Sequence, residues 1–200
     1  MSRIILLIIG IMFIFVGGFN YLIDTVKGRV KPNRVSWLLW GVIPIIIFLA
    51  EHSKGVGLIS FLTLAIGFTP VAVFVATYFN KESVWRLTKF DFACGALSII
   101  GIILWYFSRD GNTAIFFSIL ADIFVSAPTY RKSFTNPETE SYKVYFLSAI
   151  GTGIALLATE VWNFENIIFP VYVFLGCVLF TVLIKFKIGK KLSYKNSINH

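Results

Sequence analysis

The chain has 200 residues and a formal net charge of +8; 57% of its residues are hydrophobic and only 14% are charged. Soluble domains are closer to half apolar, so this composition excludes an ordinary soluble fold. Two cysteines and two histidines are too few for a disulfide framework or a His/Cys metal cluster, and we expect no cofactor.

Seven long apolar runs alternate with short charged stretches. They cover residues 4–23, 35–50, 56–79, 90–107, 113–130, 143–159 and 166–186. A helix needs roughly 20 such residues to cross about 30 Å of hydrocarbon, and the lack of period-2 alternation excludes a membrane β-barrel. The first run is too long for the apolar part of a cleaved signal peptide. The sequence therefore predicts an all-α membrane protein with seven transmembrane helices.

The basic residues lie almost entirely on one side of this predicted membrane. The loops after the first, third and fifth runs, together with the C-terminal tail, hold all 18 Lys and Arg residues except Arg3, Lys54 and Arg109. The positive-inside rule places these loops and the C-terminus in the cytoplasm and the N-terminus outside. We therefore expect the charge to set topology, with membrane lipids and not nucleic acid as partners, and a bacterial cytoplasmic membrane as the location.

The sequence also repeats itself. At an offset of 105 residues the matching pairs are Lys27 and Lys132, Pro32 and Pro137, Ser36 and Ser141, Trp37 and Tyr142, and Trp40 and Tyr145. At an offset of 100 residues, the segment 70–74 (PVAVF) matches the segment 170–174 (PVYVF). Since both copies need their basic loop in the cytoplasm, one extra crossing must separate them. The copies are therefore predicted to be parallel repeats, related by an axis along the membrane normal.

This repeat divides the chain into four parts. They are a first three-helix repeat (1–80), a linker helix (81–112), a second three-helix repeat (113–187) and a cytoplasmic tail (188–200). The end of the tail, from Lys190 to His200, is short and polar, and we expect it to be disordered.

The three–one–three arrangement, with a proline and basic residues between the first two spans of each copy, resembles the PQ-loop and SWEET transporter superfamily. The best local match is the segment 128–133 (PTYRKS), followed by Ser141 at the start of the sixth span. In the first copy, Ile23 and Asp24 stand where the superfamily has Pro-Gln. The resemblance implies two helix bundles that alternate access to a site between them. The KDEL receptor is similar in fold and binds a peptide without passing solute.

Asp122 is the sharpest functional candidate. It lies near the middle of the fifth span, about 13 Å from either end. A charged side chain at the bilayer centre costs about 3 kcal/mol on insertion scales, and such residues usually serve function. We expect Asp122 to couple transport to protons or to bind substrate. The alternative is a carboxyl satisfied by the hydroxyls of Ser118 or Ser126.

The candidate substrate-binding residues are Asn20, Thr69, Ser126, Tyr172 and Trp40. Thr69 and Tyr172 flank Pro70 and Pro170, which free backbone carbonyls in their helices, and the resemblance implies that these spans supply pocket groups. The alternative for Thr69 is a hydroxyl bonded to its own backbone, and for Tyr172 simple packing. The candidate hinges are Pro44, Pro70, Pro128 and Pro170, because proline weakens a helix.

Other residues receive structural interpretations. Trp37, Trp40, Tyr142 and Tyr145 open the second and sixth spans; an interfacial aromatic belt is favoured over a gate or a stacking surface. Lys27, Arg131 and Lys132 are interpreted as topology determinants, and Asp24 as an interfacial carboxylate paired with nearby cations. Gly151 and Ala155 have the spacing that favours close helix packing.

These features predict a transporter of a small polar solute (a sugar, an amino acid or a vitamin-like compound), with alternating access and proton coupling through Asp122. The alternative is a seven-helix receptor or sorting protein that binds a peptide or protein partner without transport. The sequence shows no nucleophile–base pair and no phosphate-binding loop, so an enzyme is not expected. The oligomeric state, including a homo-oligomer, stays open.

Overall fold

The computed structural model describes residues 2–53, 60–83, 85–108, 111–159, 162 and 164–198. Eight α-helices are present in these residues: α1 (Arg3–Val26), α2 (Arg34–Ser53), α3 (Ser60–Ala76), α4 (Lys89–Phe107), α5 (Gly111–Thr135), α6 (Tyr142–Leu157), α7 (Phe164–Lys185) and α8 (Ile188–Ile198). Two short 3-10 turns, η1 (Lys81–Ser83) and η2 (Pro137–Thr139), lie in the loops. The prediction of an all-helical protein is confirmed, and each of the seven apolar runs overlaps one of the helices α1 to α7.

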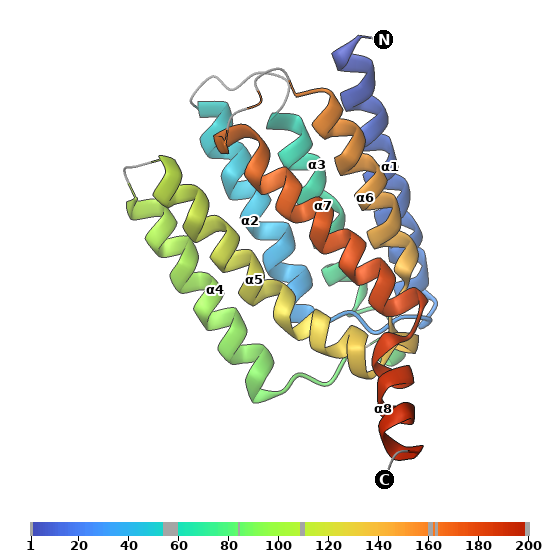
Figure 1. Ribbon diagram of the computed structural model, residues 1–200. Coiled ribbons are helices and arrows are strands. Elements are labelled where there is room, and N and C mark those ends of the chain that lie inside the picture. The colour runs from blue at the N-terminus through green and yellow to red at the C-terminus, as the bar shows by residue number, and fades with distance from the viewer. Residues whose placement is uncertain are drawn as a thin grey trace.

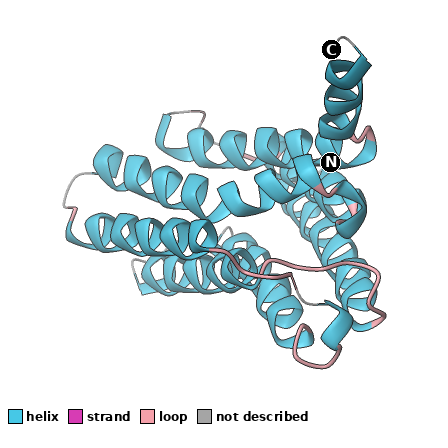
Figure 2. Cartoon of the chain, turned by 90° about the horizontal axis from the view of Figure 1, so that it is seen from below, coloured by secondary structure: helices cyan, strands magenta, loops and turns pink. Residues whose placement is uncertain are grey.

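Helices α1 to α7 lie side by side as a bundle, and the N-terminus and C-terminus lie at opposite ends of it (Figure 1). Helices α1 and α5 finish at the lower end in this view. We call this the loop end, because the α1–α2 loop (27–33) and the α5–α6 loop (136–141) meet there. Figure 2, seen from below, shows loops running across this end, with α8 projecting from it.

The two halves of the chain pack in the same pattern. Helix α3 contacts both α1 and α2, and α7 contacts both α5 and α6. The halves are joined by contacts of α1 with α6 and of α2 with α5. Helix α4 packs against α5 and α2, so it connects the halves without entering either group of three.

Helices α1 and α6 touch through their backbones. A Cβ atom placed on Gly10 would lie 2.6 Å from the carbonyl oxygen of Gly151, and one placed on Gly151 would lie 2.5 Å from the carbonyl oxygen of Gly10. Ala155 lies against Gly10 as well. Small residues permit this approach, so the spacing of Gly151 and Ala155 does mark a close helix contact.

Helix α1 ends in a Schellman turn. The backbone N–H of Gly28 donates to the carbonyl of Thr25 at 3.0 Å, and that of Arg29 donates to the carbonyl of Asp24 at 2.9 Å. Gly28 has a φ of 72°, a conformation that glycine adopts without steric cost. The Asp24 carboxylate pairs with the Arg29 guanidinium at 3.3 Å, as its interpretation as a paired interfacial acid predicts.

The C-terminal tail is helical through Ile198, so the prediction of a disordered tail is wrong. The axes of α7 and α8 differ by 48°, and Lys187 between them has a φ of 50°. Helix α8 packs against α5, and the Lys190 ammonium lies 2.7 Å from the Glu138 carboxylate in η2. Sequence polarity suggested disorder, but these tertiary contacts hold the segment as a helix.

The outer surface of the bundle carries many large apolar side chains. On α1 and α4 these include Ile4, Ile8, Met12, Phe19, Phe92, Ile99 and Ile103. In the part of the chain described, α1 and α4 are each long and apolar enough to cross a membrane, and α7 with α8 adds a third candidate if the bent pair counts as one span. Shorter apolar helical stretches lie in α2, α3 and α6. Such a surface is compatible with a membrane protein.

Candidate central binding site

A cavity of about 150 Å³ lies inside the bundle, between the two halves. All six helices of the two repeats line it, for example through Ile14 of α1, Pro44 of α2, Thr69 of α3, Asp122 of α5, Ser148 of α6 and Tyr172 of α7. An engineered protein cavity of about 150 Å³ holds one benzene molecule. The cavity is therefore large enough for a small solute, and both halves shape it.

Asp122 is the acidic group of this cavity. The Tyr172 hydroxyl donates to its Oδ2 atom at 2.9 Å, and the Ser126 hydroxyl donates to the same atom at 3.2 Å. The Trp40 side chain also contacts the carboxyl. Three of the residues predicted to bind substrate therefore surround the predicted proton-coupling residue. Ser118, the other hydroxyl considered from the sequence, has a side chain outside the described part of the structure.

The described residues that line the cavity place no cation beside the Asp122 carboxyl. Among the described residues that line the cavity there is no Lys, Arg or His. The hydroxyl donors from α5 and α7 orient the carboxyl, but they bring no positive charge. A carboxylate in such surroundings needs a proton or a bound cation to balance it.

Aromatic rings form the wall of the cavity toward the loop end. The Phe180 ring stacks on Tyr130 at 3.8 Å and on Tyr145 at 4.4 Å between centroids, and its edge contact with Trp40 spans 6.0 Å. Two rings cannot share one face of Phe180 at these distances, so Phe180 is sandwiched between the two tyrosines. Trp37 continues the cluster toward the first repeat.

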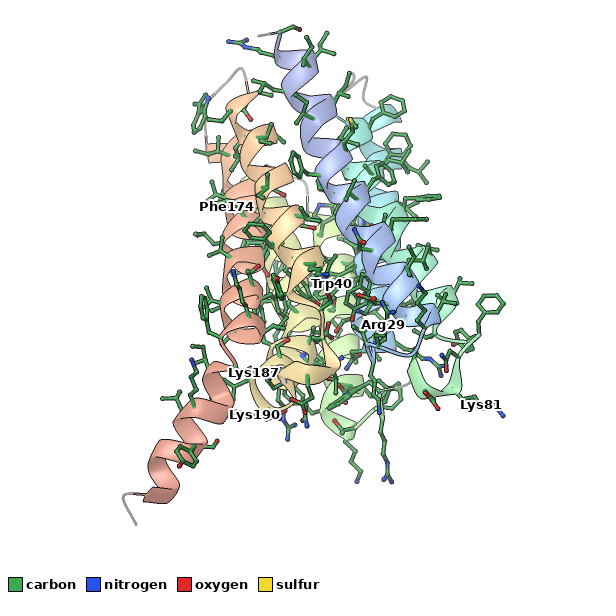
Figure 3. All side chains as sticks on the ribbon, turned by 90° about the vertical axis from the view of Figure 1, so that its right-hand side faces the viewer. Arg29, Trp40, Lys81, Phe174, Lys187 and Lys190 are labelled. Carbon is green, nitrogen blue, oxygen red and sulfur yellow. The ribbon has the colours of Figure 1, made fainter. Side chains whose placement is uncertain are left out.

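The interpretation of the tryptophans and tyrosines as an interfacial belt is wrong for Trp37 and Tyr145. Only 3% of Trp37 and 5% of Tyr145 is exposed. Trp37 stacks on Tyr21, with 4.4 Å between ring centroids. Trp40 lines the cavity and lies inside the bundle (Figure 3), while Tyr142 packs, partly buried, against the same cluster. These side chains point toward the inside of the bundle and not toward the membrane interface.

The remaining predicted site residues divide between the cavity and other places. Thr69 lines the cavity and packs against Gly18. Asn20 does not reach the cavity: its side-chain amide is exposed and donates to the carbonyl of Val16 in its own helix at 2.8 Å. The four candidate hinge prolines all lie inside helices; Pro44 and Pro70 are among the residues that line the cavity.

The loop end contains a buried ion pair that was not predicted from the sequence. The side chains of Lys132 and Glu140 are fully buried, with Nζ and Oε1 2.5 Å apart. The Tyr21 hydroxyl donates to the other Glu140 oxygen at 2.7 Å, and Lys132 Nζ also donates to the backbone carbonyl of Lys31. Lys132 is therefore an internal group that joins the two loops, a role that the sequence did not predict beside its interpretation as a topology determinant.

The two loops also bind each other through their backbones and neighbouring hydroxyls. The Lys31 N–H donates to the Thr139 carbonyl at 2.9 Å. The Ser36 hydroxyl donates to the Val125 carbonyl at 2.7 Å and accepts from Thr129 at 3.0 Å. These contacts join α2 and α5, so the loop end is held shut by bonds between the halves.

The cavity and the ion pair are directly connected through Tyr145. This residue lines the cavity, and its hydroxyl lies 3.5 Å from Glu140. A signal in the sequence could have found the acid: Glu140 follows Lys132 by eight residues, and its counterpart in the first copy is Val35. The second copy alone carries the pair.

Comparison with protein-family models, curated proteins and solved structures returned no significant match to this chain. Within the described residues, no three His, Cys, Asp or Glu side chains lie close enough together to hold a metal ion.

Proposed function

We propose that this protein is a seven-helix membrane transporter of the PQ-loop and SWEET-like type, which carries a small solute by alternating access. The single observation that carries the proposal is the cavity lined by all six repeat helices, with the Asp122 carboxyl facing it. Sites between repeats, near the midplane, are typical of transporters. The repeated packing of α1–α3 and α5–α7 and the segment 128–133 (PTYRKS) support the family assignment.

The proposed topology has helices α1 to α7 as spans, the N-terminus outside and the loop end in the cytoplasm. Odd spans carry the chain from one end to the other, and the two termini do lie at opposite ends (Figure 1). The labelled basic residues Arg29, Lys81, Lys187 and Lys190 lie toward the same, lower end (Figure 3). Basic residues gathered at one end favour a cytoplasmic location for it.

Release toward the cytoplasm requires the loop end to open. Tyr21 and Lys31 belong to the first repeat, while Lys132 and Glu140 belong to the second, so opening must break bonds between the halves. Solute enters the cavity from the opposite side, and the two halves then rock against each other. Asp122 exchanges a proton during this cycle, which links solute movement to the pH gradient.

Flux into reconstituted vesicles tests the proposal. With a pH gradient across the membrane, the wild-type protein should move at least one solute from a panel of sugars, amino acids, nucleosides, vitamins and small amines. Replacement of Asp122→Asn should lower the proton-driven flux at least tenfold, since the amide cannot exchange a proton at this position. Asp24→Asn is the matched control, because Asp24 is not among the residues that line the cavity, and its flux should stay within twofold of wild type.

Two results would change the conclusion. Proton-driven flux that is the same in Asp122→Asn as in wild type would remove Asp122 from the coupling mechanism. If no solute moves, and a stable protein or peptide partner is recovered from the native membrane, the receptor alternative is favoured over transport.

A further inference from the structure

The charge balance of the cavity restricts what it can bind. Asp122 is the only charged residue among the described residues that line it. The buried cation on the same helix, Lys132, is already engaged by Glu140 and by the Lys31 carbonyl. A solute with a carboxylate or phosphate would meet no cation here and would lie against the Asp122 carboxyl. A solute with one positive charge would balance it.

The walls of the cavity suit such a solute. Trp40 and Tyr172 line it together with aliphatic side chains, while the Phe180 ring lies between Tyr130 and Tyr145 and offers no open face. The face of an aromatic ring attracts ammonium groups, most strongly for tryptophan. Trp40 contacts both the carboxyl and the Phe180 ring, so a cation beside Asp122 lies within the aromatic wall.

Size narrows the class further. At about 150 Å³ the cavity matches one that holds a single benzene ring. That volume fits a compact amine or quaternary ammonium ion with a few carbon atoms.

We propose that the cavity binds a small organic cation, an amine or quaternary ammonium compound about the size of one six-membered ring, with Asp122 as its counter-ion. This inference rests on the proposed transport function and names the class of its substrate. One carboxylate balances one positive charge, so the cation and a proton bind to Asp122 in turn and not together. The carrier therefore exchanges one cation for one proton.

The groups around Asp122 are consistent with this competition. Tyr172 and Cys177 of α7 and Tyr130 of α5 interact with the Asp122 carboxyl, and none of them can carry a positive charge. Trp40 of α2 contacts the Asp122 carboxyl. Helix α4 packs against α5, the helix that carries Asp122, where Gly101 meets Ala121. None of the described side chains that face the Asp122 carboxyl would neutralise it. The proton and the cation therefore compete for this carboxyl.

A pair of probes of equal shape and different charge tests the inference. Choline and 3,3-dimethylbutan-1-ol differ mainly in a quaternary nitrogen in place of a quaternary carbon; tetramethylammonium is a second, smaller cation. A ligand that binds the native state raises the melting temperature of the purified protein. At pH 7.5, a cation should raise the melting temperature in a concentration-dependent way, while the neutral alcohol should not. At pH 5, the apparent Kd of the cation should be at least tenfold higher.

Variants link the effect to the named groups. Asp122→Asn should weaken binding of the cation at least tenfold, whereas Asp24→Asn should not. Trp40→Leu should weaken it more than Trp40→Phe, which keeps an aromatic face. The Trp40 pair keeps the test valid if Asp122→Asn fails to fold.

The outcomes separate this inference from the proposed function. The proposal that the substrate is a cation would be overturned if the alcohol stabilised the protein as much as choline does. It would also be overturned if none of the three probes stabilised the protein. If vesicles then show proton-driven flux of an uncharged solute, transport stands and only the substrate class is wrong. If no solute in the panel moves either, both proposals fail.

Discussion

At the scale of single residues, we expect the Lys132–Glu140 ion pair to be important for the stability of the fold. Both side chains are fully buried, and removing one partner of such a pair leaves an uncompensated buried charge at a cost of about 3–5 kcal/mol. Lys132→Met should therefore lower the melting temperature strongly, measured by thermal unfolding in detergent. The double variant Lys132→Met with Glu140→Gln should recover most of the loss, since the neutral amide still accepts from Tyr21.

The same substitution at an exposed pair is the control. Lys190 is paired with Glu138, but about half of each side chain is exposed, and such pairs contribute about 0.2–1 kcal/mol. If Lys132→Met destabilises the protein no more than Lys190→Met, the buried pair does not hold the two loops together.

These residues also show what could be read from the chain and what could not. Asp122 stands out because a lone acid in an apolar run has few explanations. Lys132 looks like any other basic residue at a helix end, and the bond between Glu140 and Tyr21 joins positions 119 residues apart. Only the folded structure brings the three together.

At the scale of helices, α8 is held by a contact that depends on pH. The hydrogen bond from Lys190 lowers the pKa of the Glu138 carboxyl below its ordinary value. A carboxyl whose pKa is lowered by folding adds stability above its unfolded pKa, about 4.3 for glutamate. That stability is lost as the pH falls through the lower, folded value.

We therefore expect α8 to loosen from the bundle in acid. A nitroxide label at Ser193→Cys, in a variant with both native cysteines replaced by alanine, should become more mobile between pH 5 and pH 3 by electron paramagnetic resonance. Lys190→Met should show the higher mobility already at pH 7 and little change with pH. The change is small, since the pair is exposed and contributes about 0.2–1 kcal/mol. Equal mobility in both variants at pH 7 would contradict the prediction.

The positions of helices α1 to α7 could be predicted from the apolar runs to within a few residues, whereas α8 could not be predicted from the sequence. Lipid leaves no water for backbone groups, so a long apolar run has almost no alternative to a helix. The segment 188–198 is polar, and its helix depends on packing against α5 and on Glu138. The close backbone contact between α1 and α6 could not be predicted either, although Gly151 and Ala155 indicated the α6 side of it.

At the scale of the whole molecule, the repeat alone does not show how the helices meet, and the extensive contact of α1 with α6 joins the two halves. The sequence indicates two groups of three helices and a linker, and the contacts of α3 and α7 follow that division. It does not show that the loops of the two copies bind each other at one end, or that the aromatic residues point inward. Both features depend on how the copies pack together, and they decide where the cavity lies and which end is shut.

The proposed topology makes a direct prediction about the two ends of the bundle. An odd number of crossings places Ser2 and Ser193 on opposite sides of the membrane, with the more basic end in the cytoplasm. A membrane-impermeant maleimide should therefore label Ser2→Cys in intact cells and label Ser193→Cys only after the membrane is opened. Both positions are exposed, and the background again has both native cysteines replaced by alanine. Labelling of both positions from outside would require an even number of crossings, and the reverse pattern would place the loop end and its ion pair on the outer side.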